Sequence, residues 1–331
     1  MPANLTPEYK NAEERFRQAK TSEEKLQALE EMLSTIPKHK GTDKMQADIK
    51  RRIAKFKDRE KGKKAKAGTR IDPYHVEREG AAQIALVGPP NSGKSTFLAN
   101  LTKAESEVAP YPYTTRKPIP GMMHFENIQF QLVDLPPLSD QFMETWVPRV
   151  VRNAQAVLLV VSLDSDDLLE ETETVLRLLM ESKVKLVGWR QWEKREKPEA
   201  WRKTLAVGTK LDREKAEDNA NIFLEFFGDR FEMIKVSIEQ GLNVEELKRA
   251  VFDMLEIIRV YTKAPGKDED RSSPYIIPTG TTVIGLAEKI HKDMVKLFKY
   301  SKVWGSSAFD GQRVQRDYVL QDEDVVELHV G

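Results

Sequence analysis

Apolar and polar residues in the first part of the chain recur in steps of three and four, which is the repeat of an amphipathic helix. Pro37 and Gly41 divide this stretch, and both residues interrupt helices. The apolar positions form one group before the break and one after it: Phe16, Leu26, Leu29, Leu33 and Ile36, then Met45, Ile49, Ile53 and Phe56. The pattern predicts a hairpin of two helices over residues 1–70, followed by a linker over residues 71–80.

From residue 81 the pattern changes to short apolar runs that alternate with helical stretches. The runs have the length and composition of buried strands and cover residues 81–87, 128–134, 157–164, 205–212 and 231–237. Strands that alternate with helices are typical of a mostly parallel sheet with helices on both faces. We therefore expect an α/β domain over residues 81–262.

The last part of the chain has the pattern of a smaller α+β unit. After a linker over residues 263–273, the segment 274–285 predicts a β-hairpin with Gly280 in its turn. Residues 286–298 have helical spacing, and residues 324–330 predict a closing strand. His291 and His329 have no Cys or His cluster around them in the sequence, so we expect surface or packing roles for both.

Composition excludes several classes of protein. A length of 331 residues fits about two or three domains. The chain has no cysteine, which excludes a disulfide scaffold, a thiolate metal site and a cysteine nucleophile. No window approaches the roughly 18 apolar residues that span a bilayer. The first residues also lack the apolar stretch of a secretory signal, so we expect a cytoplasmic protein that does not enter a membrane.

Positive charge is concentrated in one segment. The 53 basic residues of the chain balance 53 acidic ones, but residues 38–70 contain fourteen basic and four acidic residues. Such an excess is typical of contact with phosphates, and we favour RNA or a ribosome as the partner. The alternative is a solvated helix followed by a flexible Lys/Gly/Ala linker over residues 61–68.

The first predicted strand of the α/β domain leads into a phosphate-binding motif. The sequence GPPNSGKS (88–95) has the pattern G-x-x-x-x-G-K-S and is followed by a helical stretch. In such a loop backbone N–H groups surround the phosphates, while the lysine contacts the outer phosphates and the Ser/Thr hydroxyl contacts Mg²⁺. The residues predicted to bind the nucleotide here are Gly88, Pro89, Asn91, Ser92, Gly93, Lys94, Ser95 and Thr96.

Two further positions are suited to Mg²⁺. Asp134 ends a predicted strand, where an acidic residue can hold the ion through water. Thr114 and Thr115 lie between the first helix and the next strand, where a threonine can close on Mg²⁺ beside a third phosphate. The predicted metal site is therefore Ser95, Thr114, Thr115 and Asp134, and the alternative is that the last three are ordinary loop residues.

A second motif favours guanine over adenine. The strand 205–212 ends in Thr209-Lys210-Leu211-Asp212, and the carboxylate of Asp212 can accept both N1–H and N2–H of guanine. Adenine lacks this pair of donors, so it would leave the carboxylate unpaired. Lys210 can lie along the base, and a backbone N–H near Ser237 and Ile238 can meet the guanine carbonyl. The motif alone is a weak signal, but in this order after a phosphate loop it predicts GTP and GDP as ligands.

These motifs together resemble a known family. GPPNSGKST, YPYTTR, VDLP, TKLD and VS, in this order, resemble the Obg-like GTPases of the translation-factor-related class. The segment IPKHKGTDKMQADIKRRIAKFK and the C-terminal segments IRVYTK, IHKDMVKLFKYSKVWGSS, QRV and LQDEDVVELHV resemble the developmentally regulated GTP-binding (DRG) proteins. The resemblance covers about residues 36–182 and 204–331.

The resemblance implies a fold and a function. It implies an α/β P-loop GTPase (G) domain over residues 81–262, behind an N-terminal helical hairpin, and a ubiquitin-like β-grasp (TGS) domain over residues 274–331. The implied activity is Mg²⁺-dependent hydrolysis of GTP to GDP and phosphate, with catalytic roles for Asn91, Lys94 and Thr115. Ribosome or rRNA binding through residues 38–70 and the TGS domain is also implied, with no membrane contact and no DNA specificity. The alternative is a ribosome or RNA adaptor that binds guanine nucleotides with little hydrolysis.

The chain departs from the family pattern at three places. Pro137 replaces the glycine of Asp-x-x-Gly and has no N–H for the third phosphate, which predicts weaker discrimination between GTP and GDP. Leu138 stands where other GTPases keep a glutamine that orients water, which predicts that hydrolysis is slow or depends on a group from elsewhere. Asn91 is not a departure, because it matches the asparagine that helps hold K⁺ in potassium-stimulated GTPases. It can also be simply a turn residue.

The third departure is a short insert. The insert over residues 183–203 is shorter than in DRG proteins and contains Trp189, Trp192 and Trp201 among basic residues. Aromatic side chains among cations can stack on bases. We favour the alternative that the three tryptophans anchor a short surface segment to the domain.

Overall fold

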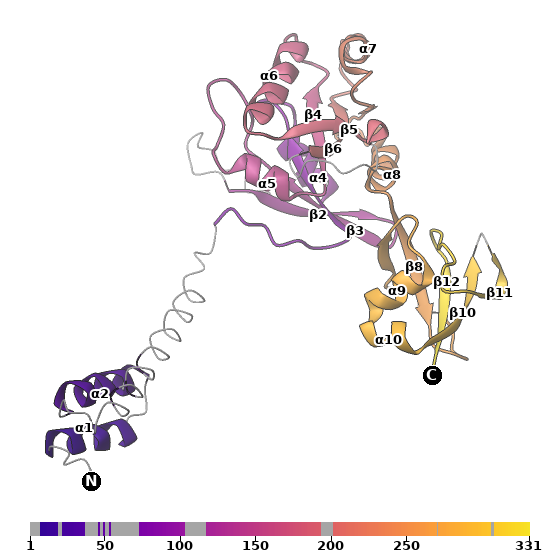
Figure 1. The fold of residues 1–331 in the computed structure, drawn as a ribbon. Helices are drawn as coiled ribbons and strands as arrows, with labels where there is room; N and C mark the ends of the chain where they lie inside the picture. Colours follow the sequence, from indigo (N-terminus) through magenta and orange to yellow (C-terminus); the bar gives the residue numbers. More distant parts are fainter. Residues whose placement is uncertain are drawn as a thin grey trace. The chain divides into compact units, whose positions relative to one another are not determined.

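The computed structural model describes residues 7–18, 22–36, 46, 49, 53, 73–102, 117–192, 201–269, 271–305 and 308–331. The chain divides into two compact units, residues 1–72 and residues 73–331 (Figure 1). Within the described residues, no helix is long and apolar enough to cross a membrane.

The first unit is built on two paired helices, α1 (Pro7–Gln18) and α2 (Ser22–Thr35). The Arg15 guanidinium lies 3.0 Å from the Glu31 carboxylate across the pair. The buried side chains form one cluster: Tyr9, Ala12, Leu29, Met32, Ile36, Ile49 and Ile53. The prediction of one helix before Pro37 was wrong, because Ser22 followed by two glutamates begins a second helix.

The predicted basic arm lies almost wholly outside the described residues. Within residues 38–70 the structure describes Gln46, Ile49 and Ile53. Both isoleucines are buried in the cluster of α1 and α2. The helical structure and the RNA contact of this arm therefore stay predictions.

The second unit begins with a seven-stranded sheet. Its order is β2-β3-β1-β4-β6-β5. The seventh strand, β7, pairs with residues 206–208 of β6, whereas β5 pairs with residues 201–204. All pairings are parallel except that of β2 with β3. The strands are β1 (Ala82–Val87), β2 (Ile119–Phe125), β3 (Ile128–Asp134), β4 (Ala156–Ser162), β5 (Lys185–Gly188), β6 (Trp201–Thr209) and β7 (Met233–Lys235).

Helices cover both faces of this sheet, as predicted. Along β1, Ile84 and Leu86 face one core with α4 and α8, while Ala85 and Val87 face another with α5, α6 and α7. Because both faces are buried, β1 and β4 are apolar almost throughout. The helices are α4 (Lys94–Leu101), α5 (Val147–Asn153), α6 (Leu168–Glu181), α7 (Ala216–Phe227) and α8 (Val244–Leu255), with a short 3-10 turn η1 (Trp189–Gln191).

Two predicted boundaries of this domain were wrong. Residues 73–80 are packed on the domain rather than forming a free linker, because Tyr74 stacks on Trp146 with ring centroids 4.6 Å apart. The predicted insert 183–203 includes β5 and the start of β6, which are strands of the sheet. Its tryptophans contact the domain: Trp189 packs on the core and the Lys185 ammonium lies 4.2 Å from the Trp201 ring centroid.

A five-stranded sheet of order β11-β10-β12-β8-β9 forms the second part of this unit. Its buried side chains include Ile258, Val260, Ile277, Leu286 and Val303. The elements are β8 (Ile257–Lys263), β9 (Tyr275–Pro278), α9 (Val283–Ile290), α10 (Lys292–Leu297), β10 (Phe298–Gly305), β11 (Ala308–Val314) and β12 (Val325–Val330).

The predicted start of this domain and its first hairpin were also wrong. The domain begins with β8, because β8 pairs with β9 and β12 and not with the larger sheet. The segment 263–273 therefore connects two strands of one sheet. Gly280 does not lie between two strands, because the Thr282 hydroxyl accepts a hydrogen bond from the Gly285 N–H and caps α9.

The turn between β2 and β3 is bonded to two buried side chains of β8, Arg259 and Tyr261. Arg259, whose side chain is 3% exposed, lies 2.6 Å from Asp322 and 3.2 Å from Glu323 and also pairs with Glu126 of the turn. The Asn127 amide lies 2.5 Å from the Tyr261 hydroxyl. Strands β2 and β3 of the larger sheet are thereby held to the strand that begins the smaller sheet.

Candidate nucleotide-binding site

The phosphate loop lies at the carboxyl end of β1, and its geometry requires glycine at two positions. A Cβ on Gly88 would lie 2.1 Å from the Val160 carbonyl oxygen on β4, which is too close for any side chain. Gly93 has a φ of 88°, a left-handed conformation that glycine adopts without steric cost. These two glycines let the loop turn tightly between β1 and α4.

The Lys94 ammonium lies inside this loop. The lysine is 6% exposed, and its ammonium donates to the Gly88 carbonyl at 3.0 Å, the Pro89 carbonyl at 2.7 Å and the Ser92 hydroxyl at 3.1 Å. A buried ammonium is held only where acceptors satisfy it. The loop thus concentrates one positive charge beside the N-terminus of α4, an arrangement suited to phosphates.

Two predicted Mg²⁺ ligands lie together next to this loop. The Ser95 hydroxyl donates to the Asp134 carboxylate at 2.9 Å, and Asp134 ends β3 with 7% exposure. An oxygen pair of this kind suits Mg²⁺, which is held by one or two protein oxygens together with waters and phosphates. Within the described residues there is no group of three or more His, Cys, Asp or Glu that could hold a metal. The predicted ligands Thr114 and Thr115 lie outside the described residues.

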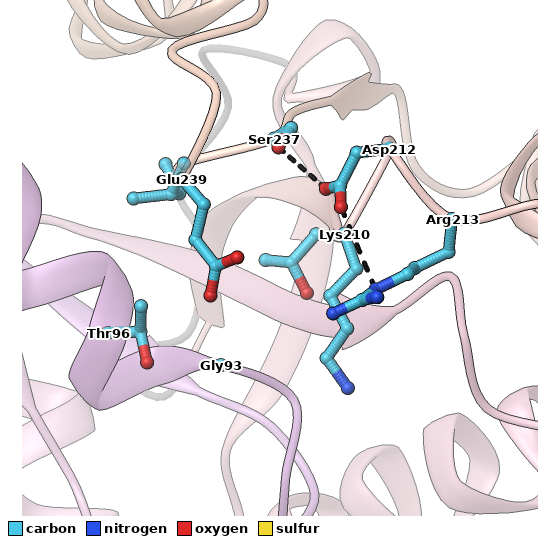
Figure 2. A pocket seen from close by; sticks show the side chains of 9 residues that line it. Gly93, Thr96, Lys210, Asp212, Arg213, Ser237 and Glu239 are labelled. Carbon is cyan, nitrogen blue, oxygen red and sulfur yellow. Dashed lines mark hydrogen bonds and ion pairs between the residues drawn. The ribbon is translucent and has the colours of Figure 1, made fainter.

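Asp212 and Ser237 meet at the other end of the site (Figure 2). The Ser237 hydroxyl donates to the Asp212 carboxylate at 2.6 Å, and the Arg213 guanidinium lies 3.7 Å from the same carboxylate. These contacts, first of all the Ser237 hydrogen bond, lower the pKa of Asp212. The group is therefore held as a carboxylate that can accept hydrogen bonds.

One pocket joins the two ends of the site. It is lined by Gly93, Thr96, Thr209, Lys210, Asp212, Arg213, Ser237, Ile238 and Glu239. The Thr209 hydroxyl lies 2.7 Å from the Ser92 carbonyl, which attaches the end of β6 to the phosphate loop. Residues from both predicted motifs thus surround one space.

Two lining residues were missed, and one predicted contact differs. Arg213 and Glu239 line the pocket, and their positions directly after Asp212 and two residues after Ser237 could have drawn attention to them. A backbone N–H at Ser237 or Ile238 was predicted to meet the guanine carbonyl, but that of Ser237 donates to the Leu242 carbonyl at 3.3 Å. The prediction therefore stays open only for Ile238, which lines the pocket. Ser237 contributes its hydroxyl to Asp212 instead.

Comparison with known proteins identifies the family. The family model described as 50S ribosome-binding GTPase matches residues 83–188, and the TGS domain model matches residues 258–330. An uncharacterized GTP-binding protein of Methanocaldococcus jannaschii is 30% identical, with 92% of each chain covered. Developmentally-regulated GTP-binding protein 1 of Xenopus laevis is 26% identical and covers 92% of this chain and 98% of its own. This chain belongs to the DRG-type, Obg-like family of GTPases.

Solved structures support the fold of this GTPase. A GTP-binding protein of Pyrococcus horikoshii has a TM-score of 0.51 at 19% identity, covering 75% of this chain and all of its own. The YchF GTPase of Schizosaccharomyces pombe has a TM-score of 0.50 at 15% identity, covering 76% of this chain and 99% of its own. The larger sheet is therefore a P-loop GTPase domain, and the smaller sheet is the β-grasp TGS domain.

The segment after Asp134 is tightly packed in this GTPase. Leu138 is 1% exposed, and its side chain lies in the core with Val87 and Val147. Its N–H donates to the Gly88 carbonyl at 3.1 Å. The leucine is therefore turned away from solvent and attached to the phosphate loop, in addition to lacking a polar group that could orient water.

Replacing Ser237 with alanine is expected to weaken GDP binding about tenfold, because a hydrogen bond to a charged group contributes about 1.5 kcal/mol. The Ser237 bond lowers the pKa of Asp212, so without it the carboxyl group becomes protonated at a higher pH. GDP affinity should therefore start to fall at a higher pH in the variant than in the parent. Fluorescence titration with GDP across acidic pH measures both effects.

Ser165→Ala provides the matched control, because its hydroxyl also donates to a carboxylate, Glu171, at 2.9 Å but lies outside the pocket. An unchanged pH profile in Ser237→Ala would contradict the role assigned to this hydroxyl.

Proposed function

We propose that this protein is a Mg²⁺-dependent GTPase that works on the ribosome or in ribosome assembly. The observation that carries the proposal is the single pocket in which Gly93 and Thr96 of the phosphate loop lie together with the paired Asp212 and Ser237. The pocket lies between the phosphate loop, whose N–H groups and lysine would contact the phosphates, and the Asp212 carboxylate, which can accept hydrogen bonds from guanine. The match to the 50S ribosome-binding GTPase model supports the ribosomal setting.

The proposed reaction is attack of water on the third phosphate of GTP. The new P–O bond forms as the bond between the second and third phosphates breaks, which gives GDP and phosphate. Mg²⁺, when bound, would neutralise charge on the outer phosphates, and Ser95 and Asp134 are the described residues that would hold it. Lys94 would contact the outer phosphates and Asp212 would hold the base, while Thr114 or Thr115 stays a predicted ligand.

The proposed intrinsic turnover is slow, because Leu138 lies in the core and offers no polar atom to the attacking water. Pro137 also has no N–H to give the third phosphate, and one such bond is worth about 1.5–3 kcal/mol. GTP and GDP should therefore differ in affinity by less than about a hundredfold.

Potassium is expected to raise the turnover above that in sodium, because Asn91 would help hold the cation where it stabilises charge in the transition state. Asn91 has a φ of 58°, so Asn91→Gly removes the side chain while permitting the same backbone. The variant should lose the difference between the two salts in a phosphate-release assay.

Asn243→Gly is the matched control, since Asn243 has a φ of 56° and lies at the start of α8, outside the phosphate loop. Equal rates for the parent protein in both salts would contradict the role of Asn91.

The second candidate function is a guanine-nucleotide-dependent adaptor with little hydrolysis. The buried Leu138 and its bond to the Gly88 carbonyl favour this candidate. Two measurements separate the GTPase from the adaptor: phosphate release from GTP in KCl with and without ribosomes, and co-sedimentation of the protein with ribosomes. Stimulated release supports the GTPase, whereas nucleotide-dependent co-sedimentation without release supports the adaptor.

A further inference from the structure

One carboxylate in the nucleotide pocket has no role in the guanine contact described above. Glu239 is an exposed residue that lines this pocket together with three other charged residues: Lys210, Asp212 and Arg213. Asp212 is bonded to the Ser237 hydroxyl, whereas the Glu239 carboxylate has no hydrogen bond or ion pair within the part of the chain that the structure describes. The pocket therefore contains one carboxylate that is held in place and a second that can accept hydrogen bonds from a ligand.

The backbone that carries Glu239 is fixed by a tight turn. Ser237 and Leu242 exchange backbone hydrogen bonds of 3.3 and 2.9 Å, which close the turn at its base. The Ser237 hydroxyl accepts a hydrogen bond from the Gln240 N–H at 3.3 Å and donates to the Asp212 carboxylate at 2.6 Å. One hydroxyl thus connects the group that would bind the base to the turn from which the Glu239 side chain projects.

The Glu239 side chain extends from the base end of the pocket toward the phosphate loop. Figure 2 shows it directed toward the segment that carries Gly93 and Thr96, and away from the Asp212 carboxylate. In a nucleotide the sugar joins the base to the phosphates. A guanine bound by Asp212 and phosphates bound beside Gly93 therefore place the sugar between these two residues, next to the Glu239 carboxylate.

We propose that Glu239 accepts a hydrogen bond from a ribose hydroxyl of the bound guanine nucleotide and excludes nucleotides that carry phosphate on the 3′ oxygen. A carboxylate only accepts hydrogen bonds, and the 2′ and 3′ hydroxyls are the donors of the sugar. A phosphate on the 3′ oxygen removes one donor and places negative charge beside the carboxylate, which repels it. The inference rests on the proposed function, because it requires that GTP and GDP occupy this pocket.

The proposed contact provides a selectivity that the base contact cannot provide. Asp212 would bind an edge of guanine that is the same in ribonucleotides, deoxynucleotides and nucleotides phosphorylated on the sugar. A group beside the sugar distinguishes them, because it loses its partner when the hydroxyl is absent. Since Glu239 is exposed, water replaces the lost partner, and we expect an effect of about tenfold, at the lower end for a hydrogen bond to a charged group.

The first test is calorimetric titration of the full chain with GDP and with 2′,3′-dideoxy-GDP in the presence of Mg²⁺. Glu239→Ala is expected to weaken GDP binding about tenfold and to leave the affinity for dideoxy-GDP unchanged, since only GDP has hydroxyls to lose. The ratio of the two affinities isolates the sugar, because altered base or phosphate contacts would affect both ligands. A ratio that is the same in Glu239→Ala as in the parent protein overturns the proposal.

The second test uses guanosine 5′-diphosphate 3′-diphosphate (ppGpp) to measure the effect of charge. The parent protein is expected to bind ppGpp at least about tenfold more weakly than GDP. Glu239→Gln keeps an acceptor oxygen and removes the charge, so this difference should narrow about tenfold, with a smaller change in GDP affinity. Glu214→Gln is the matched control, because Glu214 is an exposed carboxylate two residues after Asp212 that lies outside the lining of the pocket.

The control separates a local contact from a general field. A narrowed difference in Glu239→Gln alone supports the proposal, whereas an equal change in Glu214→Gln indicates the overall charge of the surface and overturns it. Parent protein that binds ppGpp as tightly as GDP also overturns it.

The same titrations separate this inference from the proposed function. Parent protein that binds GDP, while both Glu239 variants keep its ratios for the three ligands, refutes the inference alone. Parent protein that binds no guanine nucleotide refutes the proposed function.

Discussion

Asp212→Asn is expected to weaken GTP and GDP binding by about a hundredfold or more. The carboxylate can accept from both N1–H and N2–H of guanine, and each bond to a charged group is worth about 1.5–3 kcal/mol. The amide of asparagine has one acceptor oxygen and would set its NH₂ group against a guanine donor. The substitution also removes the charged partner of the Ser237 hydroxyl, which lies 2.6 Å from the Asp212 carboxylate.

The same substitution should alter which base is preferred. Xanthine has a carbonyl where guanine has its amino group, so the amide NH₂ that Asp212→Asn introduces has an acceptor to meet. Calorimetric titration with GDP and xanthosine diphosphate measures the change. Asp218→Asn, which alters an exposed carboxylate in the first turn of α7, is the matched control. Unaltered GDP affinity in Asp212→Asn would remove the guanine site on which the proposed function depends.

The residues of this pocket could be predicted from sequence to different degrees. The phosphate loop is a local motif, because Gly88, Lys94 and Ser95 act within a few residues of one another. Asp212 also follows from its place in the sequence just after a strand, since β6 ends at Thr209. The contact of the Ser237 hydroxyl with Asp212 could not be predicted from sequence. It depends on the parallel pairing of β6 with β7, and the sequence alone does not specify which strands pair.

The domain boundary before the TGS sheet shows a related limit. The segment IRVYTK resembles part of TGS domains, and its alternation of residues fits a strand. Which sheet it joins depends on contacts with β12, where Tyr261 pairs with Val325 across a long sequence separation. Strand propensity is local, whereas the choice of partner is not. The strand was therefore placed in the wrong domain, although its residues were recognised.

Arg259→Met is expected to destabilise the connection between the two sheets by about 1.5–3 kcal/mol, because Arg259 is buried whereas its carboxylate partners are 30–54% exposed, so water partly compensates the charge that the substitution leaves. Arg259 is 3% exposed and lies 2.6 Å from Asp322 and 3.2 Å from Glu323, in addition to its pair with Glu126. Methionine keeps the length of the side chain but removes the cation that Asp322 and Glu323 share, while Glu126 keeps its pair with Arg249.

Hydrogen exchange is the appropriate measurement, because a chain of several domains need not unfold in one step. Amides of β8 and of the β2–β3 turn should exchange about ten- to a hundredfold faster in Arg259→Met, which is the kinetic equivalent of that free energy when opening is local. Arg249→Met is the matched control, since Arg249 is 52% exposed and pairs with the same Glu126 at 2.9 Å. Exposed pairs contribute about 0–1 kcal/mol, so this control should change exchange severalfold at most. Equal effects of the two variants would mean that the ion pairs of Arg259 add no more stability than the exposed pair of Arg249. The β2–β3 turn would then be held to β8 by other contacts.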